Sequence, residues 1–492
     1  MNIYNSFKPR FVPEKPFLLS SKLDVTYSYM DIDQKSGSIA SYLTNLGLKE
    51  GDRLMAQMEK TPETILLYLA CLRSGIVYIP LNTSYLTEEI KFFVNDAEPS
   101  LIVTDREREK TFELLIEKKK VLTIESLIES TSKPENQEKS FLTKEMSDSS
   151  IAVMLYTSGT TGNPKGAMIS HGNLLSNVIS LTKIWKWEKN DVLLHSLPIY
   201  HVHGLFVGLH MPLFNSSAII YLDKFSASQV VSLLPKATVF MGVPTYYVRM
   251  LREESLNSAI CNNMRCFISG SAPLLEKTFN EFKKRTGFEI VERYGMTETG
   301  MNTSNPLSGE KKIGTVGLPL EGTQVRIRNK EGHIAKDNET GELEIKGRNV
   351  FGGYWRKERQ TDEDFTADGF FMTGDLAKVD EDKYVTIIGR KKDLIISGGL
   401  NVYPKEVESV IDSLPGVKES AVIGLPHFEF GEKVCGIVIT EKGKQLSEAE
   451  ILRKLKSILA NFKIPKEIYF MKELPRNSMG KVKKKFLREK FG

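Results

Sequence analysis

Cysteine is scarce in this chain of 492 residues, which contains only Cys71, Cys261, Cys266 and Cys435. Four cysteines in so long a chain do not form a disulfide framework, and Cys261 with Cys266 lacks the second pair of ligands that a zinc site needs. We therefore expect all four to be small buried hydrophobic residues.

A clear membrane span is also absent from the sequence. The longest stretch without Asp, Glu, Lys or Arg runs from Val192 to Leu222, and it holds two prolines and four histidines (Pro198, Pro212, His195, His201, His203 and His210). Although the stretch is long enough to cross a bilayer, these residues favour a buried core in a soluble protein. The N-terminal sequence MNIYNSFKPRFVPEKPF has no apolar signal region, and the C-terminal REKFG carries no sorting signal. We expect a cytoplasmic protein with no integral membrane association.

The chain has little excess charge, and what it has is confined to one end. From Asp393 onward, 18 Lys and Arg face 13 Asp and Glu, a difference equal to the net charge of +5 of the whole chain. Nucleic acid is therefore not expected as a partner, because a phosphate-rich small molecule needs far fewer positive charges. The sequence gives no indication of oligomeric state.

The length and the pattern of apolar residues predict more than one domain. Helical and strand-like stretches alternate over residues 24–105, which is typical of an α/β layer with parallel strands. Residues 106–120 read as a charged surface helix, and TVFMGVPTYYVRML at 238–251 reads as a strand. Short strands and turns over residues 314–345 predict a small β subdomain, and a new α+β unit begins with GRKKDLIISGGLNVYPKEVE at 389–408.

What the sequence does contain is the loop YTSGTTGNPKG, which runs from Tyr156 to Gly166 directly after an apolar run at 151–155. Its glycines allow backbone N–H groups to turn toward one point and bind anionic oxygens. The loop adds four hydroxyl side chains and one positive charge (Thr157, Ser158, Thr160, Thr161 and Lys165). A Walker loop needs a Ser or Thr after its Lys, whereas Lys165 is followed by Gly166. We therefore expect a phosphate-binding loop of a different kind, and not a Walker-type ATPase or kinase.

Four further motifs follow along the chain. They are RYGMTET at 293–299, TGD and GRKKD with Asp375 and Arg390, and PRNSMGKVKKK with Lys481. Together with YTSGTTGNPKG they cover about residues 25 to 490, and in order and spacing they resemble the adenylate-forming enzymes. This superfamily contains the acyl-CoA synthetases, the luciferases and the adenylation domains of peptide synthetases.

The resemblance implies that ATP is bound by Thr157, Ser158, Gly159, Thr160, Thr161, Gly162, Lys165, Tyr294, Thr297, Asp375, Arg390 and Lys481. It implies catalytic roles for Lys481, Glu298, Thr157 and His201, with Glu298 holding Mg²⁺. A carboxylate beside a phosphate loop repels the substrate unless a hard cation lies between them. The implied reaction converts a carboxylic acid and ATP to an acyl-AMP and pyrophosphate, after which the thiol of coenzyme A attacks the acyl carbon.

The resemblance also implies an α/β (α+β overall) architecture with two domains. The first, residues 1–388, is built of α/β layers with the small β subdomain and binds ATP and the acid. A hinge at 389–393, with Lys392 at the family's hinge position, leads to a small mobile α+β domain at 394–492. Ser397, Gly398 and Gly399 resemble the loop of the pantetheine tunnel, and His201 resembles the gate of that tunnel.

The acyl pocket departs from the general pattern of the superfamily. The residue before the Tyr of YGMTE is usually small in coumarate and fatty-acid ligases, but here it is Arg293. An Arg at an apolar site stays uncompensated unless the substrate supplies an anion. We therefore predict a dicarboxylic acid bound by Arg293, with Arg249, Ser269 and His203 as weaker candidates. Arg249 equally fits a surface Arg paired with Glu253 or Glu254, and His203 fits a core histidine.

Within the superfamily the motifs are most similar to those of the malonyl-CoA synthetases. The predicted acid is malonate or methylmalonate, which differ by one methyl worth only about 1–3 kcal/mol in a pocket. The alternatives are a synthetase for another short or medium acid and an adenylation enzyme that loads a carrier-protein thiol. A luciferase-type oxygenase is disfavoured, because a pocket with an Arg does not suit a flat heteroaromatic acid.

Overall fold

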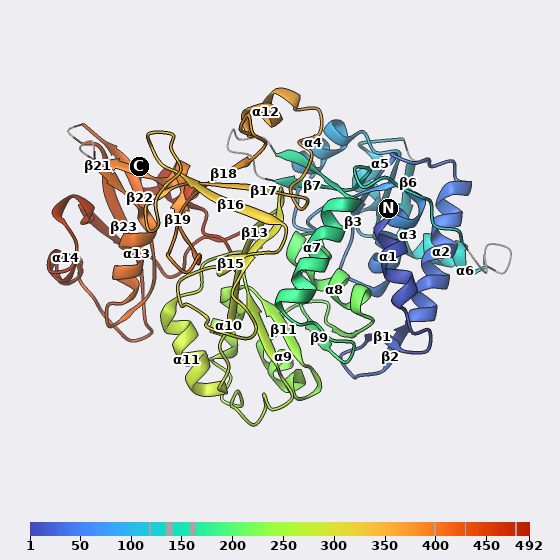
Figure 1. Cartoon of the computed structure of the whole chain (residues 1–492), viewed down its shortest axis with the longest axis horizontal. Coiled ribbons are helices and arrows are strands. Elements are labelled where there is room, and N and C mark those ends of the chain that lie inside the picture. The colour runs from blue at the N-terminus through green and yellow to red at the C-terminus, as the bar shows by residue number, and fades with distance from the viewer. Residues whose placement is uncertain (118–119, 134–140, 158–163, 398–399, 429, 478–479) are drawn as a thin grey trace.

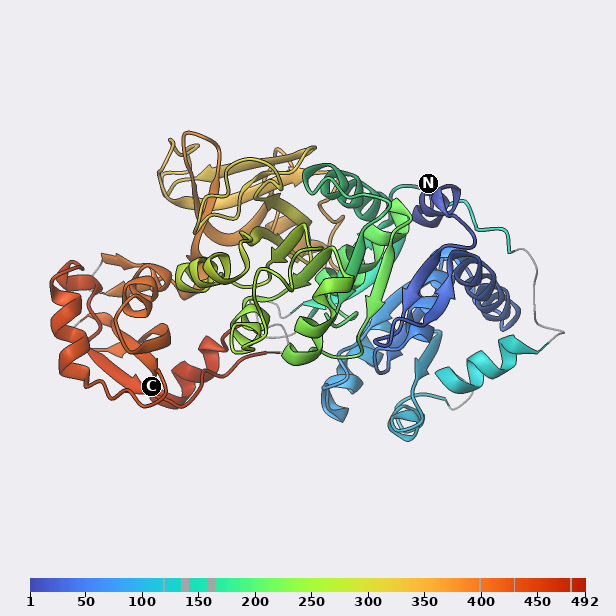
Figure 2. The same cartoon turned by 90° about the horizontal axis from the view of Figure 1, so that it is seen from below.

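The computed structural model describes residues 1–117, 120–133, 141–157, 164–397, 400–428, 430–477 and 480–492. Two large sheets make up most of the molecule, and the C-terminal residues form a separate lobe beside them (Figures 1 and 2). The predicted α/β class with a smaller C-terminal unit is confirmed.

The first large sheet has the strand order β6-β5-β3-β4-β7-β8. Its strands are β3 (Arg53–Gln57), β4 (Val77–Pro80), β5 (Leu101–Thr104), β6 (Val121–Thr123), β7 (Ile151–Thr157) and β8 (Lys165–Ser170). Its helices are α2 (Tyr29–Asn45), α3 (Pro62–Ser74), α4 (Thr87–Ala97), α5 (Glu109–Glu113) and α6 (Ile124–Ser132). All neighbouring strands are parallel except β7 and β8, which pair as an antiparallel hairpin around the YTSGTTGNPKG loop.

The second large sheet has the order β15-β14-β13-β12-β11-β9-β10-β1-β2. Its strands are β1 (Pro16–Leu19), β2 (Val25–Ser28), β9 (Val192–His195), β10 (Ala218–Tyr221), β11 (Val239–Gly242), β12 (Cys266–Ser269), β13 (Val291–Met296), β14 (Gly300–Ser304) and β15 (Leu318–Pro319). Its helices are α1 (Ile3–Phe7), α7 (His171–Ile184), α8 (Gly208–Asn215), α9 (Ala227–Leu233), α10 (Pro244–Met250) and α11 (Glu276–Thr286). The parallel strands β9, β11, β12 and β13 end at one edge, where ligands bind in open α/β sheets.

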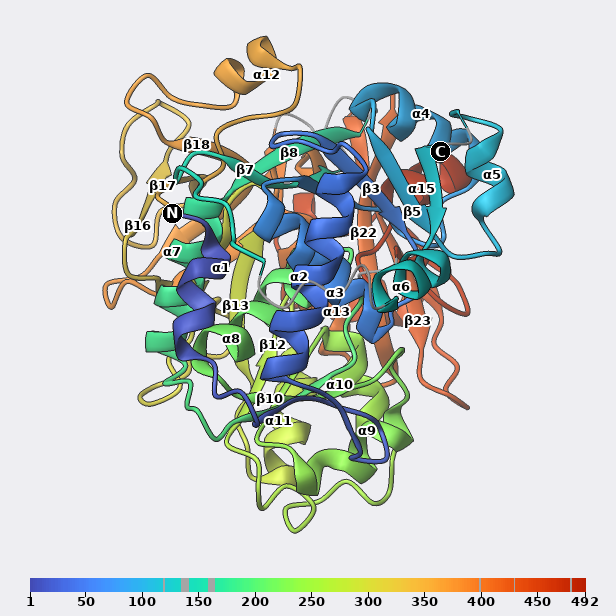
Figure 3. The same ribbon diagram turned by 90° about the vertical axis from the view of Figure 1, so that its right-hand side faces the viewer.

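One apolar core joins the two sheets. It contains Leu54 and Val153 from the first sheet, Leu193 and Ile268 from the second, and most of α3 between them. Helices α1, α2 and α3 lie side by side in this region (Figure 3). A second core covers the opposite face of the second sheet, where Phe267 packs with residues of α9, α10 and α11. The strands are therefore covered on both faces, as their apolar sequences predict.

Two smaller sheets follow. The antiparallel sheet β16-β17-β18-β19 consists of β16 (Thr323–Arg328), β17 (Gly341–Gly347), β18 (Phe371–Val379) and β19 (Val385–Arg390), with α12 (Glu358–Glu363) between β17 and β18. The last sheet consists of β20 (Ile395–Ser397), β21 (Leu400–Val402), β22 (Val417–His427), β23 (Gly431–Thr440) and β24 (Glu467–Phe470). It carries α13 (Pro404–Asp412), α14 (Glu448–Lys456) and α15 (Lys484–Phe491). Arg488 Nη2 of α15 lies 2.6 Å from Asp393 Oδ1, which connects the last helix to the start of this lobe.

Three sequence predictions need correction. TVFMGVPTYYVRML is a strand only as far as Gly242, because Pro244 at the first turn starts helix α10. In the described part of the charged stretch at 106–120, the α-helix α5 spans only Glu109–Glu113, and Phe112 is its one buried side chain. In the segment 314–345, β15 pairs with β14 of the second large sheet and only the later strands form the small β sheet. The prediction for the four cysteines is confirmed, because all are buried and free.

The apolar stretch from Val192 to Leu222 forms β9, a π-helix at His203–Val207, α8 and β10, all inside the second sheet and its core. Across the described part of the chain, no helix is both long and apolar enough to cross a membrane.

Candidate active site

The hairpin of β7 and β8 places two predicted residues at its mouth. Thr157 and Lys165 are opposite each other in the antiparallel register. The intervening Ser158, Gly159, Thr160, Thr161 and Gly162 lie outside the described residues. Lys165 is buried, with its Nζ 3.6 Å from Asp364 Oδ2 and 4.6 Å from the centre of the Tyr354 ring. The Lys165 charge is therefore fixed between an aromatic ring and a carboxylate.

Glu298 is connected to this hairpin. Its Oε1 accepts hydrogen bonds from the hydroxyl groups of Thr157 at 3.3 Å and Tyr354 at 3.2 Å. Burial raises the pKa of the Glu298 carboxyl, and Arg390 and the hydrogen bonds offset only part of this effect. Tyr354 and Asp364 were not predicted from the sequence, and the only signal for Tyr354 is its position after Phe351-Gly352-Gly353.

Asp375 and Arg390 are cross-strand partners in β18 and β19. Arg390 Nε lies 2.7 Å from Asp375 Oδ1, and the hydroxyl of Tyr294 donates to Asp375 Oδ2. Arg390 also donates to the carbonyl of Thr373 at 3.3 Å. The structure thus brings together three of the predicted ATP residues, which start from separate motifs.

Lys481 comes to the same place from the C-terminal lobe. A short turn holds its backbone, because Asn477 accepts from the Lys481 N–H and donates its own N–H to the Lys481 carbonyl, both at 2.9 Å. Gly480 has a φ of +75°, and a Cβ there would lie 3.4 Å from the Thr245 hydroxyl of α10. The Lys481 side chain is open to solvent, yet desolvation by the surrounding protein lowers the pKa of its ammonium.

The charges that act on Lys481 identify its neighbours. Arg390 lowers its pKa further, whereas Asp375 and Glu298 raise it. Lys481 in turn contributes to the pKa of His201, which burial first and Lys481 second lower to about 4. The structure therefore brings the described ATP motifs and the four predicted catalytic residues to one site.

Arg293 lies at the same edge of the sheet and is almost completely buried, with 3% of its surface exposed. Its Nε and Nη2 have no hydrogen-bond partner among the described residues. Burial lowers the pKa of this guanidinium to about 9. The side chain crosses Gly270, where a Cβ would lie only 2.4 Å from Arg293 Cζ. Gly270 is therefore required for the position of Arg293.

His203 is the second buried group without partners. It begins the π-helix, and neither of its imidazole nitrogens has a hydrogen-bond partner within the described chain. Burial lowers its pKa well below 6.5, and Arg293 lowers it further. Since buried polar groups are normally paired, two adjacent side chains with four unpaired nitrogens indicate a site for an anionic ligand.

The other two predicted substrate residues are not brought to Arg293. Ser269 is the register partner of Glu292, so it lies on the opposite face of the sheet from Arg293. Its hydroxyl is buried without a partner among the described residues. Arg249 is exposed in the last turn of α10. Roles for both stay predictions.

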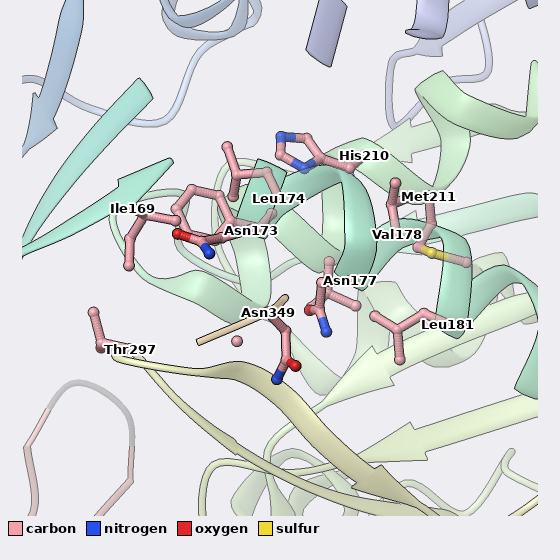
Figure 4. A pocket seen from close by; sticks show the side chains of 13 residues that line it. Ile169, Asn173, Leu174, Asn177, Val178, Leu181, His210, Met211, Thr297 and Asn349 are labelled. Carbon is pink, nitrogen blue, oxygen red and sulfur yellow. The ribbon is translucent and has the colours of Figure 1, made fainter. Parts of the chain in front are cut away.

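The remaining predicted residues are placed as follows. Ser397 is buried at the end of β20, and Lys392 is exposed in a short 3₁₀ turn at Lys391–Asp393. Gly398 and Gly399 lie outside the described residues. Thr297 lines a cavity of about 20 Å³. Figure 4 shows that Thr297 and Asn349 lie on one side of this cavity and that side chains of α7 lie on the other. That volume holds about one water molecule, so this cavity is not the acyl site.

Two models of known families match this chain. The model described as AMP-binding enzyme matches residues 8–355, and the model of the AMP-binding enzyme C-terminal domain matches residues 406–481. The chain is similar to the mitochondrial malonate–CoA ligase ACSF3 of Mus musculus, with 34% identity over 94% of this chain and 86% of that one. It is also similar to the long-chain-fatty-acid–CoA ligase of Bacillus subtilis, with 31% identity over 94% of this chain and 90% of that one.

Solved structures resemble the whole chain. ATP-bound MatB from Rhodopseudomonas palustris has 45% identity and a TM-score of 0.96, and the match covers 100% of this chain and 98% of that chain. The apo structure of the same protein gives a TM-score of 0.86 at 44% identity and the same coverage. This chain therefore has the shape of the ATP-bound structure more closely than that of the apo structure.

The burial of Glu298 leads to a prediction about stability. Because the pKa of Glu298 is raised in the folded state, the native protein binds this proton more strongly than the unfolded chain does. Its ionisation therefore costs stability as pH rises through the raised pKa. We expect Glu298→Gln to raise the Tm of the protein without nucleotide by about 1–3 °C at pH 7.5. The gain should disappear below about pH 4, the ordinary pKa of a glutamate.

Thermal unfolding measured from pH 4 to pH 8 checks this prediction. The control is Glu281→Gln, which removes a carboxylate from an exposed position of α11. A lower Tm for Glu298→Gln at pH 7.5, or a gain that is the same at both ends of the range, contradicts a raised pKa for the Glu298 carboxyl in the folded protein.

Proposed function

Since the chain belongs to the family of AMP-binding enzymes, we propose that it is an ATP-dependent ligase that joins malonate to coenzyme A. The carboxylate of the acid attacks the α-phosphorus of ATP, so that a P–O bond forms and pyrophosphate leaves. The thiol of coenzyme A then attacks the acyl carbon, and AMP leaves. No side-chain nucleophile is needed, and the protein supplies alignment and neutralises charge.

The observation that carries the choice of acid is that Nε and Nη2 of the buried Arg293 have no hydrogen-bond partner in the described part of the chain. Removing a cation from water costs several kcal/mol, and within the described residues Arg293 Nε and Nη2 have no acceptor that offsets this cost. A second carboxylate on the substrate supplies that acceptor, and His203 faces the same position. An acid with a single carboxylate leaves the charge stranded. Malonate, the shortest diacid with a methylene between its carboxyl groups, fits this requirement.

The names of the relatives support the proposal but do not decide the acid by themselves. The mouse relative is a malonate–CoA ligase, and the R. palustris structure is of MatB. However, the B. subtilis relative acts on long-chain fatty acids at almost the same identity. Family membership thus supports the chemistry, and Arg293 supports the acid.

For ATP, we assign the ribose to Asp375 and the phosphates to the hairpin of β7 and β8 together with Lys481. A carboxylate suits two hydroxyl donors, and Arg390 and Tyr294 hold the Asp375 side chain in place for them. Lys481 is a compact charge on a long stem, which suits the developing charge between the α-phosphate and the acid.

Mg²⁺ fits the donors around Glu298. Mg²⁺ is usually bound by one or two carboxylates together with substrate phosphates, and not by a cage of protein groups. Glu298 with the hydroxyl of Thr157 supplies such oxygens, and among the described residues no cluster of three or more metal-binding side chains exists elsewhere. When bound, the cation neutralises phosphate charge, and the repulsion between Glu298 and ATP is removed.

For coenzyme A, we assign residues 389–393 as a hinge between a domain at 1–388 and a mobile domain at 394–492. The exposed position of Lys392 supports this assignment, because a hinge residue must change its backbone angles freely. The higher TM-score with ATP-bound MatB supports an arrangement for the first half-reaction, with Lys481 in the site. Rotation then moves Lys481 out and turns Ser397 and its neighbours toward the thiol.

The two half-reactions should therefore separate in a Lys481 variant. We expect Lys481→Ala to slow acyl-AMP formation by roughly 10²–10³-fold, the usual loss for one preorganised donor, and to leave thioester formation from supplied malonyl-AMP within threefold of the wild type. Pyrophosphate release and single-turnover thioester formation measure the two steps. Lys485→Ala, an exposed position on α15, is the matched control. Equal losses in both steps contradict the domain alternation.

The acid preference should reverse when Arg293 is replaced by an apolar residue. Arg293→Leu should cost about 2–5 kcal/mol with malonate, the range for stranding one member of a buried charged pair. This cost is roughly 30-fold to several thousandfold in kcat/KM. Propionate and butyrate should be unaffected or improved, because they strand no charge in the variant.

The measurement is kcat/KM for malonate, succinate and butyrate, with Tm as the control for folding. Arg359→Leu removes a charge from a position that is 93% exposed and should change none of the ratios. The same series for Arg249→Leu tests whether that residue shares the role. A proportional loss with all three acids in Arg293→Leu is the signature of a structural Arg and rules out the carboxylate clamp.

A further inference from the structure

A lysine that belongs to none of the motifs reaches the core between the two large sheets. Lys60 lies in the loop between β3 and α3, and its Nζ contacts Nδ1 of His195 at 2.9 Å, the His195 carbonyl at 3.0 Å and the Leu222 carbonyl at 2.5 Å. The Tyr221 ring lies 4.3 Å from the same atom. All three N–H bonds of the ammonium are therefore used inside the protein, at the ends of two neighbouring strands.

These contacts fix the tautomer of His195. Its Nε2 lies 2.9 Å from the carbonyl of Gly204, which accepts only, so Nε2 carries the proton. Nδ1 is then the acceptor for Lys60. Burial and the Lys60 charge lower the pKa of His195 well below 6.5, so the neutral ring persists at neutral pH. A hydrogen-bond chain thus runs from Lys60 through His195 to Gly204.

Gly204 belongs to the π-helix that carries His203. In this turn the Gly208 N–H donates to the His203 carbonyl, and π-helical turns are frequent at functional sites. The fit around the turn is tight, since a Cβ on Gly204 would lie 2.0 Å from the Pro198 carbonyl and one on Gly208 would lie 2.3 Å from His195 Nε2. The turn cannot shift without breaking the bond to His195.

The side chain at the start of this turn, His203, lies within electrostatic reach of Arg293. The charge of Arg293 lowers the pKa of His203, and each of the two side chains has two buried nitrogens without a partner among the described residues. The position of His203 relative to Arg293 is therefore set by the turn, and the turn is held by Lys60 and His195.

We propose that Lys60 and His195 are positioning residues that hold the π-helix so that His203 and Arg293 together bind the distal carboxylate of the acid. This inference rests on the proposed function, since it concerns the same acid. Neither residue touches the reacting atoms. Their effect is on selectivity between a diacid and a monoacid, and ATP is bound by other elements.

The test is the kinetics of the full chain with Lys60→Met, measured with malonate and propionate at saturating ATP and coenzyme A. We expect KM for malonate to rise about 10-fold to 100-fold, as for a lost charge-assisted hydrogen bond, with kcat within threefold. KM for ATP and kcat/KM for propionate should stay within threefold. Lys224→Met, an exposed lysine after β10, is the matched control and should leave all values unchanged.

Two variants of His195 separate positioning from general stability. His195→Gln keeps a donor for Gly204 and an acceptor for Lys60, so it should retain at least a third of the wild-type preference for malonate. His195→Phe keeps a ring but neither bond, so it should lose the preference as Lys60→Met does. Equal effects of Gln and Phe overturn the proposal.

The tautomer is read on the wild-type protein, and a variant is needed only to assign the His195 signals. In the ¹⁵N spectrum of the histidine-labelled wild type at pH 7.5, the His195 signals are those absent from the spectrum of His195→Gln. We expect a protonated Nε2 and an unprotonated Nδ1, and the opposite tautomer or an imidazolium overturns the proposal.

The kinetic outcomes also distinguish this proposal from the proposed function. A wild type without preference for malonate over propionate refutes the proposed function and this inference with it. A wild type that prefers malonate, with Lys60→Met keeping that preference, refutes the positioning role alone.

Discussion

An arginine whose buried Nε and Nη2 find no acceptor among the described residues is the constraint on which the acyl half of this site depends. The guanidinium of Arg293 loses its water within β13, and Nε and Nη2 gain no hydrogen bond among the described residues. Burying such a group costs free energy, and its pKa falls because burial disfavours the charged form. The chain nevertheless makes space for it, since only a glycine at 270 lets the side chain cross the neighbouring strand. A buried polar group without a partner is tolerated in the free protein where a bound ligand supplies the missing partner.

The ATP half of the site has the opposite character. There the polar groups have partners within the protein: Asp375 pairs with Arg390 and accepts from the Tyr294 hydroxyl, Lys165 lies near Asp364, and Glu298 accepts from Thr157 and Tyr354. These groups are held in place before any ligand arrives, which reduces the reorganisation needed when phosphate binds. Lys481 alone comes from the C-terminal lobe, on a turn that depends on the positive φ of Gly480. The ATP half of the site is therefore preorganised, whereas the acyl half needs a negative charge from the substrate to pair with Arg293.

Many residues of the site could be predicted from the sequence, because they belong to short motifs whose residue types indicate what they bind. The residue types of the loop after β7 indicate phosphate binding by themselves. The roles of the YGMTE segment, Asp375, Arg390 and Lys481 follow from their resemblance to motifs of the adenylate-forming enzymes, and the structure brings the described members together. Arg293 stood out because the residue before the Tyr of YGMTE is usually small in the coumarate and fatty-acid ligases that the motif resembles, whereas this chain has an arginine there.

Other features could not be found in this way. Lys60 and His195 are 135 residues apart, and nothing in the residues around either one indicates a contact across two sheets. The π-helix has the same apolar sequence as an ordinary turn of helix, and only the structure reveals its bond from Gly208 to His203. Ser269 seemed to belong with Arg293, but the register places it beside Glu292, on the opposite face of the strand. Strand alternation is visible in a sequence, whereas register between distant strands is not.

The central claim is that the site selects an acid with a second carboxylate. It is tested most directly by letting equimolar malonate, succinate, propionate and butyrate compete for the wild-type protein with limiting ATP and coenzyme A, and by identifying the CoA thioesters by mass spectrometry. The account predicts that malonyl-CoA is the main product, with the two monoacid thioesters as minor products. A mixture in which propionyl-CoA or butyryl-CoA predominates contradicts it, because a buried unpaired guanidinium then has no role in choosing the acid.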